Sequence, residues 1–217
     1  MKGDIIVLER HHIEAGKIIT ASILEKINMV NRRYIVTVSG ESGSGKSETA
    51  KAISDALLEE GIASAVLGQD DYFVLPPKSN DRRRREDDSW LGPHVEVRMD
   101  LLNEHVAAAR NGEDAIVKPL VNYAEDSVSD ERVSLEGVKV LIAEGTYTAL
   151  LRGVDCRVFI NRNRLDTLEH RQKRNRGNEV GDPFIEDVLK TEHKIIAGHR
   201  FLADIVISKD YEVSVKP

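Results

Sequence analysis

The chain has 217 residues, 41% of them hydrophobic and 31% charged, a composition ordinary for one soluble globular domain. Its formal net charge of −6 argues against general electrostatic binding to nucleic acid or anionic membranes. A single cysteine, Cys156, excludes an internal disulfide, and no segment approaches the ~20 apolar residues of a membrane span. We therefore expect a cytoplasmic protein with neither nucleic-acid nor membrane partners.

Short apolar runs typical of strands alternate with helical patterns along the chain. Strands are expected at 4–8, 34–38, 63–67, 138–143, 156–160 and 204–208. Helices are expected at 13–30, 46–60, 95–110, 164–176 and 183–200. This alternation predicts an α/β sandwich with a mostly parallel central sheet and helices on both faces. Residues 115–118 and 132–135 are expected to form a small extra β element.

Two segments lie outside this regular pattern. Residues 1–33 are interpreted as an N-terminal strand–helix extension of the main domain, 34–217, and His11–His12 within it as an exposed loop pair rather than metal ligands. Residues 76–93 are interpreted as a mobile, solvated loop, because acids balance the Arg82–Arg85 run. A role as a substrate lid stays open for this loop.

The strongest motif is Gly40–Ser47, GESGSGKS, which fits the G-x-x-x-x-G-K-[ST] pattern of a P-loop. A strand pattern precedes it and a helix pattern follows, as that motif requires. Its glycines let backbone N–H groups approach phosphates, Lys46 supplies a point charge, and the Ser47 hydroxyl binds Mg²⁺. The fold class is therefore a P-loop NTPase sandwich, with ATP and Mg²⁺ as cofactors. The predicted nucleotide-binding residues are Gly40, Glu41, Ser42, Gly43, Ser44, Gly45, Lys46, Ser47 and Glu48.

Acidic residues follow two other predicted strands. Asp70 and Asp71 come directly after the strand at 63–67, where open α/β sheets bind ligands, and one of them can accept the proton of an attacking hydroxyl. Glu144 ends the strand at 138–143 and is expected to hold Mg²⁺ or its water. The alternatives are a turn or capping Asp and a solvent-facing Glu.

A basic segment near the C-terminus predicts a lid. Residues 162–176 contain six Arg or Lys against two acids, and Arg171 and Arg174 share one helix face. Arginines on a closing lid stabilise the charge that spreads over a phosphoryl group in transfer. The alternative is a solvated basic helix face.

Taken together, these motifs resemble the uridine kinase and phosphoribulokinase family of P-loop kinases, from about residue 34 to 208. GESGSGKS is similar to the family's P-loop, QDDYF to its Q-D-S-F-Y element, and IAEGTY to its E-G strand end. RQKRNRG resembles the R-x-x-x-x-R-G of its lid, about 162–178, and LADIVI its late strand. The resemblance implies catalytic roles for Asp70, Lys46, Arg171 and Arg176, and Mg²⁺ binding by Ser47, Asp70 and Glu144. It implies substrate binding by Asp71, Tyr72, Phe73 and Tyr123.

Departures from the family pattern concern the phosphoryl acceptor. Tyr123 stands in the region where uridine kinases carry a Tyr and a His, but no His follows it, and Leu168 replaces a frequent lid Arg. Residues 90–97, WLGPHVEV, resemble the G-P element of bacterial phosphoribulokinases. We expect a uridine-kinase-like small-molecule kinase, with a nucleoside or a phosphosugar as substrate. In the phosphosugar alternative, Arg82–Arg85 or His94 meets the substrate phosphate.

A regulatory NTPase is a weaker hypothesis, because no N-K-x-D-like guanine motif is present. The sequence leaves open whether the chain assembles into a homo-oligomer.

Overall fold

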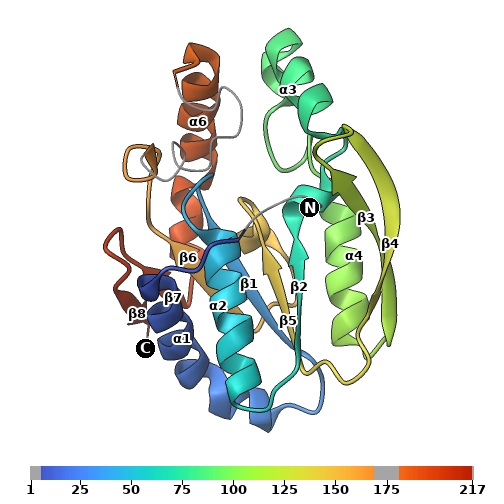
Figure 1. The fold of residues 1–217 in the computed structure, drawn as a ribbon, viewed down its shortest axis with the longest axis vertical. Coiled ribbons are helices and arrows are strands. Elements are labelled where there is room, and N and C mark those ends of the chain that lie inside the picture. The colour runs from blue at the N-terminus through green and yellow to red at the C-terminus, as the bar shows by residue number, and fades with distance from the viewer. Residues whose placement is uncertain (1–5, 169–180, 217) are drawn as a thin grey trace.

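The computed structural model describes residues 6–168 and 181–216 (Figure 1). Within them, six strands form one sheet in the order β2-β5-β1-β6-β7-β8. Their bounds, in that order, are Ser64–Gly68, Val140–Glu144, Tyr34–Gly40, Cys156–Ile160, Ile205–Ile207 and Val213–Val215. All neighbouring strands run parallel except β7 and β8. The predicted mostly parallel sheet is confirmed.

Helices cover both faces of this sheet, and alternate residues of its strands face opposite layers. On one face Val36 and Ile142 pack against α1, Arg10–Met29, and α2, Lys46–Glu59. On the other, Ile35 and Leu141 pack in a core with α4, Met99–Arg110, and the hairpin of β3, Ala115–Asn122, and β4, Ser127–Ser134. Figure 1 shows α3, Pro77–Glu86, and α6, Pro183–Ile196, rising beyond the carboxyl ends of the strands. This edge of the sheet is where the motif residues gather.

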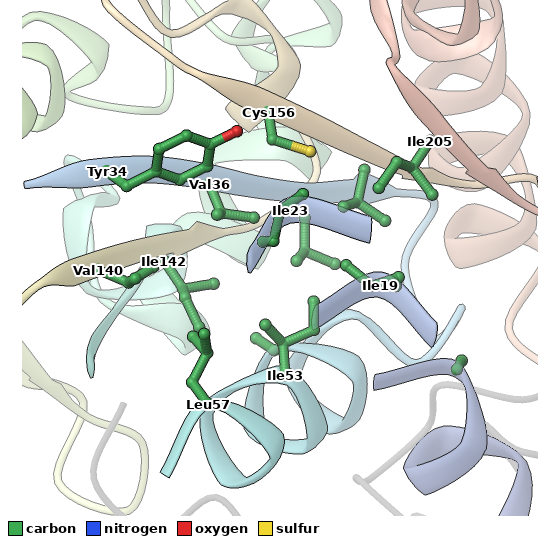
Figure 2. Packing of buried hydrophobic residues seen from close by; sticks show 14 of the residues in the cluster. Ile19, Ile23, Tyr34, Val36, Ile53, Leu57, Val140, Ile142, Cys156 and Ile205 are labelled. Carbon is green, nitrogen blue, oxygen red and sulfur yellow. The ribbon is translucent and has the colours of Figure 1, made fainter. Parts of the chain in front are cut away.

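The first helix belongs to the main core. Ile19 and Ile23 of α1 lie with Ile53 and Leu57 of α2 against the sheet (Figure 2). The two helices approach so closely that a Cβ atom added to Gly16 would lie 2.6 Å from the Ala52 carbonyl carbon. Residues 10–29 are therefore packed into the domain that carries the P-loop motif.

Two predictions for the N-terminal segment are wrong. Residues 6–8 form no strand; Ile6 and Val7 are 44% and 61% exposed, so burial does not drive them into the sheet. His11 and His12 lie in α1 rather than in a loop, and His12 is buried, with Nδ1 accepting from Glu9 N and Nε2 bonded to Tyr211 Oη. His12 therefore helps to begin α1 and contacts Tyr211 in the distant C-terminal segment.

The charged segment at 76–93 is not the irregular loop that we predicted. It contains α3 and the short 3-10 helix η2, Asp88–Trp90. Pro77 stands at the first position of α3, where its missing N–H costs nothing, and ion pairs four residues apart, Arg85–Asp81 and Arg83–Asp87, stabilise the helix and its end. The acids that cancel the arginine charge in the sequence are the helical partners of those arginines.

The predicted helix 164–176 falls mostly outside the described residues. Residues 164–167 form a turn, and 169–180 are not described. No helix in the described ranges is long and apolar enough to cross a membrane.

Candidate active site

The predicted P-loop connects β1 to α2, and its shape depends on glycine. Gly45 caps α2 with a φ of 95°, and Gly40 has a φ of 155°. A Cβ atom added to Gly45 would also lie 2.7 Å from Tyr211 Oη. The positive φ of Gly45 therefore favours glycine, and an added Cβ would also displace Tyr211 Oη. Because α2 begins at Lys46, its positively polarised N-terminal end faces the loop and favours bound phosphate.

Glu144 lies at the end of β5, between the ends of β1 and β2. It is in register with Val38 on one side and with Gly68 on the other. Ser47 Oγ, in the first turn of α2, donates a hydrogen bond of 3.2 Å to Glu144 Oε1. The structure thus joins the hydroxyl of the P-loop motif to the predicted strand-end acid.

The negative charge of Asp70 acts on the carboxylate of Glu144. Burial raises the pKa of Glu144 to about 7; the negative charge of Asp70 also raises it, and Lys46 opposes the shift. Two carboxylates beside a Ser47 hydroxyl form an oxygen-donor set of the kind that Mg²⁺ prefers. The described residues contain no cluster of three or more His, Cys, Asp or Glu. The residues present therefore fit Mg²⁺.

Polar groups of the P-loop form hydrogen bonds within the loop and with α6. Lys46 Nζ donates to the Glu41 carbonyl at 2.9 Å. Glu192, a buried residue of α6, accepts from Ser42 N at 2.8 Å and from Ser42 Oγ at 2.9 Å, and burial raises its pKa. The neighbouring His193 Nδ1 lies 2.5 Å from Glu41 Oε1. We did not predict these α6 contacts, because Ser42 and Glu192 are 150 positions apart in the chain.

The two adjacent aspartates, Asp70 and Asp71, lie in a short 3-10 helix, η1, Gln69–Tyr72. Asp70 lines the main cavity beside the P-loop. Asp71 points into the interior, where Oδ2 accepts from Lys118 Nζ at 2.6 Å and Oδ1 accepts from Val121 N at 3.0 Å. Consecutive residues of a 3-10 turn project in different directions. The pair therefore has one member at the cavity and one that ties η1 to β3.

The aromatic residues that we predicted to bind substrate also lie in two different places. Phe73 and Tyr123 line the same cavity as Asp70. Tyr72 is fully buried, and its hydroxyl lies 2.8 Å from His105 Nδ1 of α4. The structure thus brings Phe73 and Tyr123 to the cavity and places Tyr72 with Asp71 behind it.

A buried ion pair forms part of the cavity wall. Glu96 is fully buried, and its Oε2 accepts from Arg84 Nε at 2.7 Å and Nη2 at 2.6 Å. Asn80 Nδ2 donates to the same oxygen at 3.1 Å, and Asn80 Oδ1 accepts from Trp90 Nε1 at 2.8 Å. We did not predict this group. Arg84 and Glu96 are twelve residues apart, and neither helical nor strand spacing predicts a contact between them.

The beginning of the predicted lid contacts the P-loop through Tyr211. Arg162 Nη1 donates to Tyr211 Oη at 2.6 Å, and this hydroxyl donates to the Ser44 carbonyl at 3.3 Å. His12 reaches the same hydroxyl from α1, at 3.1 Å. The predicted lid residues Arg171 and Arg176 lie outside the described residues.

Most of the predicted site therefore converges on one cavity of about 250 Å³. Its lining includes Ser42, Gly43, Gly45, Lys46, Ser47, Glu48, Asp70, Phe73, Asn80, Arg84, Glu96, Tyr123, Glu144, Tyr147 and Glu192. We call the part of the lining that contains the P-loop and the strand-end acids the phosphate end. We call the part that contains Asn80, Arg84, Glu96, Phe73 and Tyr123 the acceptor end.

A mostly parallel sheet, a glycine loop at a helix N-terminus and acids at the adjacent strand ends define a P-loop nucleotide-binding protein. Residues 35–178 match the model of the Phosphoribulokinase / Uridine kinase family. The chain belongs to this family of kinases.

Comparison with individual proteins gives several relatives. The chain is 32% identical, over 83% of its length, to the bifunctional alpha-galactosidase/sucrose kinase AgaSK of Mediterraneibacter gnavus, of which it spans only 20%. It is 26% identical to a uridine kinase of Bacillus mycoides (strain KBAB4), over 82% of this chain and 86% of that protein. Its fold matches that of a D-glycerate 3-kinase from Cryptococcus neoformans var. grubii serotype A, with a TM-score of 0.63 at 14% identity, over 96% and 99% of the two chains.

Proposed function

We propose that this protein transfers the γ-phosphoryl group of ATP, in the presence of Mg²⁺, to a hydroxyl group of a small molecule. The observation that carries the proposal is the convergence of Lys46, Ser47, Asp70 and Glu144, from three separate segments, on one cavity. A turn between a strand and a helix needs none of these side chains, whereas phosphoryl transfer uses all of them. The phosphates of ATP would lie along residues 40–48, at the N-terminus of α2.

Each residue has a role in the proposed reaction. Asp70 accepts the proton of the acceptor hydroxyl while its oxygen attacks the γ-phosphorus; the bond from that phosphorus to the β-phosphate oxygen breaks, and ADP leaves. Lys46 carries its charge to the β and γ phosphates. Ser47 and Glu144, together with Asp70, would hold Mg²⁺, which when bound neutralises negative charge on the phosphates. A positioned general base is typically worth ~10²–10⁴ in rate.

Arg171 and Arg176 complete the proposal as residues of a lid, about 162–178. Their assignment rests on the resemblance of RQKRNRG to the family's lid motif. Arg162, at the beginning of this segment, is attached to the P-loop through Tyr211, which supports coupling between the lid and the phosphate site. In the transition state, negative charge spreads over the γ-phosphoryl oxygens, and arginines that close over it stabilise it.

The acceptor is a second question within the same activity. The names of the relatives, a sucrose kinase and a uridine kinase, support a sugar or nucleoside hydroxyl. A phosphosugar is the alternative, and the presence of Arg84 in the cavity is the observation in its favour. His94 and Arg82, which could have met a substrate phosphate, are exposed, and neither is among the residues that line the described cavity.

The proposal is tested by measuring ADP release from ATP and Mg²⁺ with and without uridine, sucrose, fructose and their phosphates. We expect ADP release that depends on one of these acceptors, together with a phosphorylated product identified by mass spectrometry. Slow ADP release that no acceptor accelerates would instead support a regulatory NTPase.

A further inference from the structure

The acceptor end contains an arginine whose charge is already neutralised. Arg84 binds Oε2 of the fully buried Glu96 through both Nε and Nη2, and the arginine side chain itself is only 20% exposed. Gly92 N at 3.2 Å and Tyr147 Oη at 3.4 Å donate to the other carboxylate oxygen. Removal of Glu96 from this position would break contacts with three separate segments, so the ion pair is fixed in the wall.

The Arg84–Glu96 pair is neutral overall, but Arg84 can still donate a hydrogen bond. In the described residues, neither the Arg84–Glu96 hydrogen bonds nor the salt bridge uses Nη1 of Arg84, the third guanidinium nitrogen. An uncharged hydroxyl can accept from Nη1 at no electrostatic penalty. A phosphate group at the same place would gain Arg84 but would also approach the buried Glu96 carboxylate, and like charges in a poorly solvated site repel strongly.

The other arginines of α3 do not supply the missing charge. Arg83 pairs with Asp87, and Arg85 pairs with both Asp81 and Asp182. Arg82 is exposed and is not among the residues that line the described cavity. Of the residues at the acceptor end, Phe73 and Tyr123 add aromatic surface rather than cations. Aromatic walls with a few placed polar groups are typical of sites for uncharged organic ligands.

From these contacts we infer that the Arg84–Glu96 pair restricts the phosphoryl acceptor to uncharged polyhydroxylated molecules, sugars or nucleosides, and excludes phosphosugars. Arg84 Nη1 donates to an acceptor hydroxyl, and Glu96 fixes the guanidinium and cancels its charge. This inference rests on the proposed kinase function and states which class of acceptor that kinase uses.

The first test uses the unaltered protein and matched acceptors that differ by one phosphate. Sucrose is compared with sucrose 6-phosphate, and uridine with uridine 3′-monophosphate, by kcat/KM for ADP release and by calorimetric binding in the presence of a non-hydrolysable ATP analogue. In the pair that is used, we expect the unphosphorylated member to have a kcat/KM higher by about tenfold or more. Equal or better use of the phosphorylated member overturns the inference.

The second test changes the charge of the pair at nearly constant shape. Glu96→Gln keeps an acceptor for Arg84 and removes the negative charge, so it should shift the ratio of phosphorylated to unphosphorylated use by about tenfold toward the phosphorylated acceptor. Arg82→Gln removes one charge from an exposed position of the same helix, and the ratio should not change. A loss of activity in Glu96→Gln with no change of ratio would assign the pair a structural role only.

Failure of the proposed function gives a different result. If sucrose or uridine binds but no acceptor accelerates ADP release, the kinase proposal fails while the acceptor class stands. If neither unphosphorylated molecule binds, or only the phosphates bind, the acceptor class is wrong. The comparison with the unaltered protein decides this even if Glu96→Gln does not fold.

Discussion

The two ends of the cavity are built in different ways. The phosphate end comes from short contiguous motifs, the loop 40–47 and the acids that follow two neighbouring strands, which the parallel sheet brings to one edge. The acceptor end is assembled from α3, the segment that contains Glu96, and the region around β3, through contacts between side chains. The first serves a reaction that many proteins share, whereas the second decides which molecule takes part. Substitutions at the phosphate end should therefore lower the rate of phosphoryl transfer to every acceptor by a similar factor.

The largest effect is expected at Lys46. Lys46→Ala removes the charge that meets the β and γ phosphates and should abolish measurable transfer, a loss of roughly 10³-fold or more, whichever acceptor is supplied. Lys51→Ala is the matched control, because Lys51 lies in the same helix but pairs with Asp55 at the surface. Turnover by each variant, with circular dichroism to verify folding, decides the matter. Near-native activity in a folded Lys46→Ala protein would contradict the P-loop assignment.

A smaller but still large effect is expected at Asp70. Asp70→Asn removes the proposed base while preserving shape and should lower kcat by roughly 10²-fold or more, with little change in nucleotide affinity. Single-turnover kinetics and equilibrium binding of an ATP analogue separate the two quantities. A variant that binds the nucleotide much more weakly but turns over normally would assign Asp70 to the cofactor alone.

The next effect in size is expected at the arginines of the predicted lid. Arg171→Ala or Arg176→Ala should lower turnover by about 10²-fold or more and change ATP affinity by well under tenfold, since the charges act in the transition state. Lysine at either position should restore activity only in part, because a point charge does not reproduce a two-pronged guanidinium contact. Kinetics at saturating acceptor measure this. Unchanged turnover in both alanine variants would reduce the basic segment to a solvated surface.

The same contrast explains what could be predicted from the sequence. The sheet, the P-loop and Glu144 were predictable because each is a local pattern whose place at the carboxyl edge follows from strand order. The Arg84–Glu96 pair was not, since the charge run in α3 was interpreted as a solvated loop and its partner carries no motif. Contacts such as Glu192 with Ser42 depend on how α6 packs over the loop, and no spacing in the chain encodes that packing.

The smallest effect on turnover is expected at Asp71, the residue that connects η1 to β3 and so joins the two ends. In the resemblance this residue binds substrate, but its carboxylate lies in the interior between Lys118 Nζ and Val121 N. Asp71→Asn keeps one acceptor atom and loses the charge that Lys118 faces in a site where both side chains are buried. Lys118 retains Glu131 at 2.9 Å, so the loss should be below that of breaking an isolated buried pair.

We therefore expect Asp71→Asn to lower the free energy of unfolding by about 1–3 kcal/mol and kcat by less than tenfold. Urea denaturation measures the first quantity and steady-state kinetics the second. Glu131→Gln is the control, because the Glu131 side chain is 42% exposed and its loss should hardly change stability. A variant of Asp71 that is as stable as the parent but slower than Asp70→Asn would reverse the assignment. Asp71 would then be the base, and η1 would have to turn its second aspartate to the cavity when substrates bind.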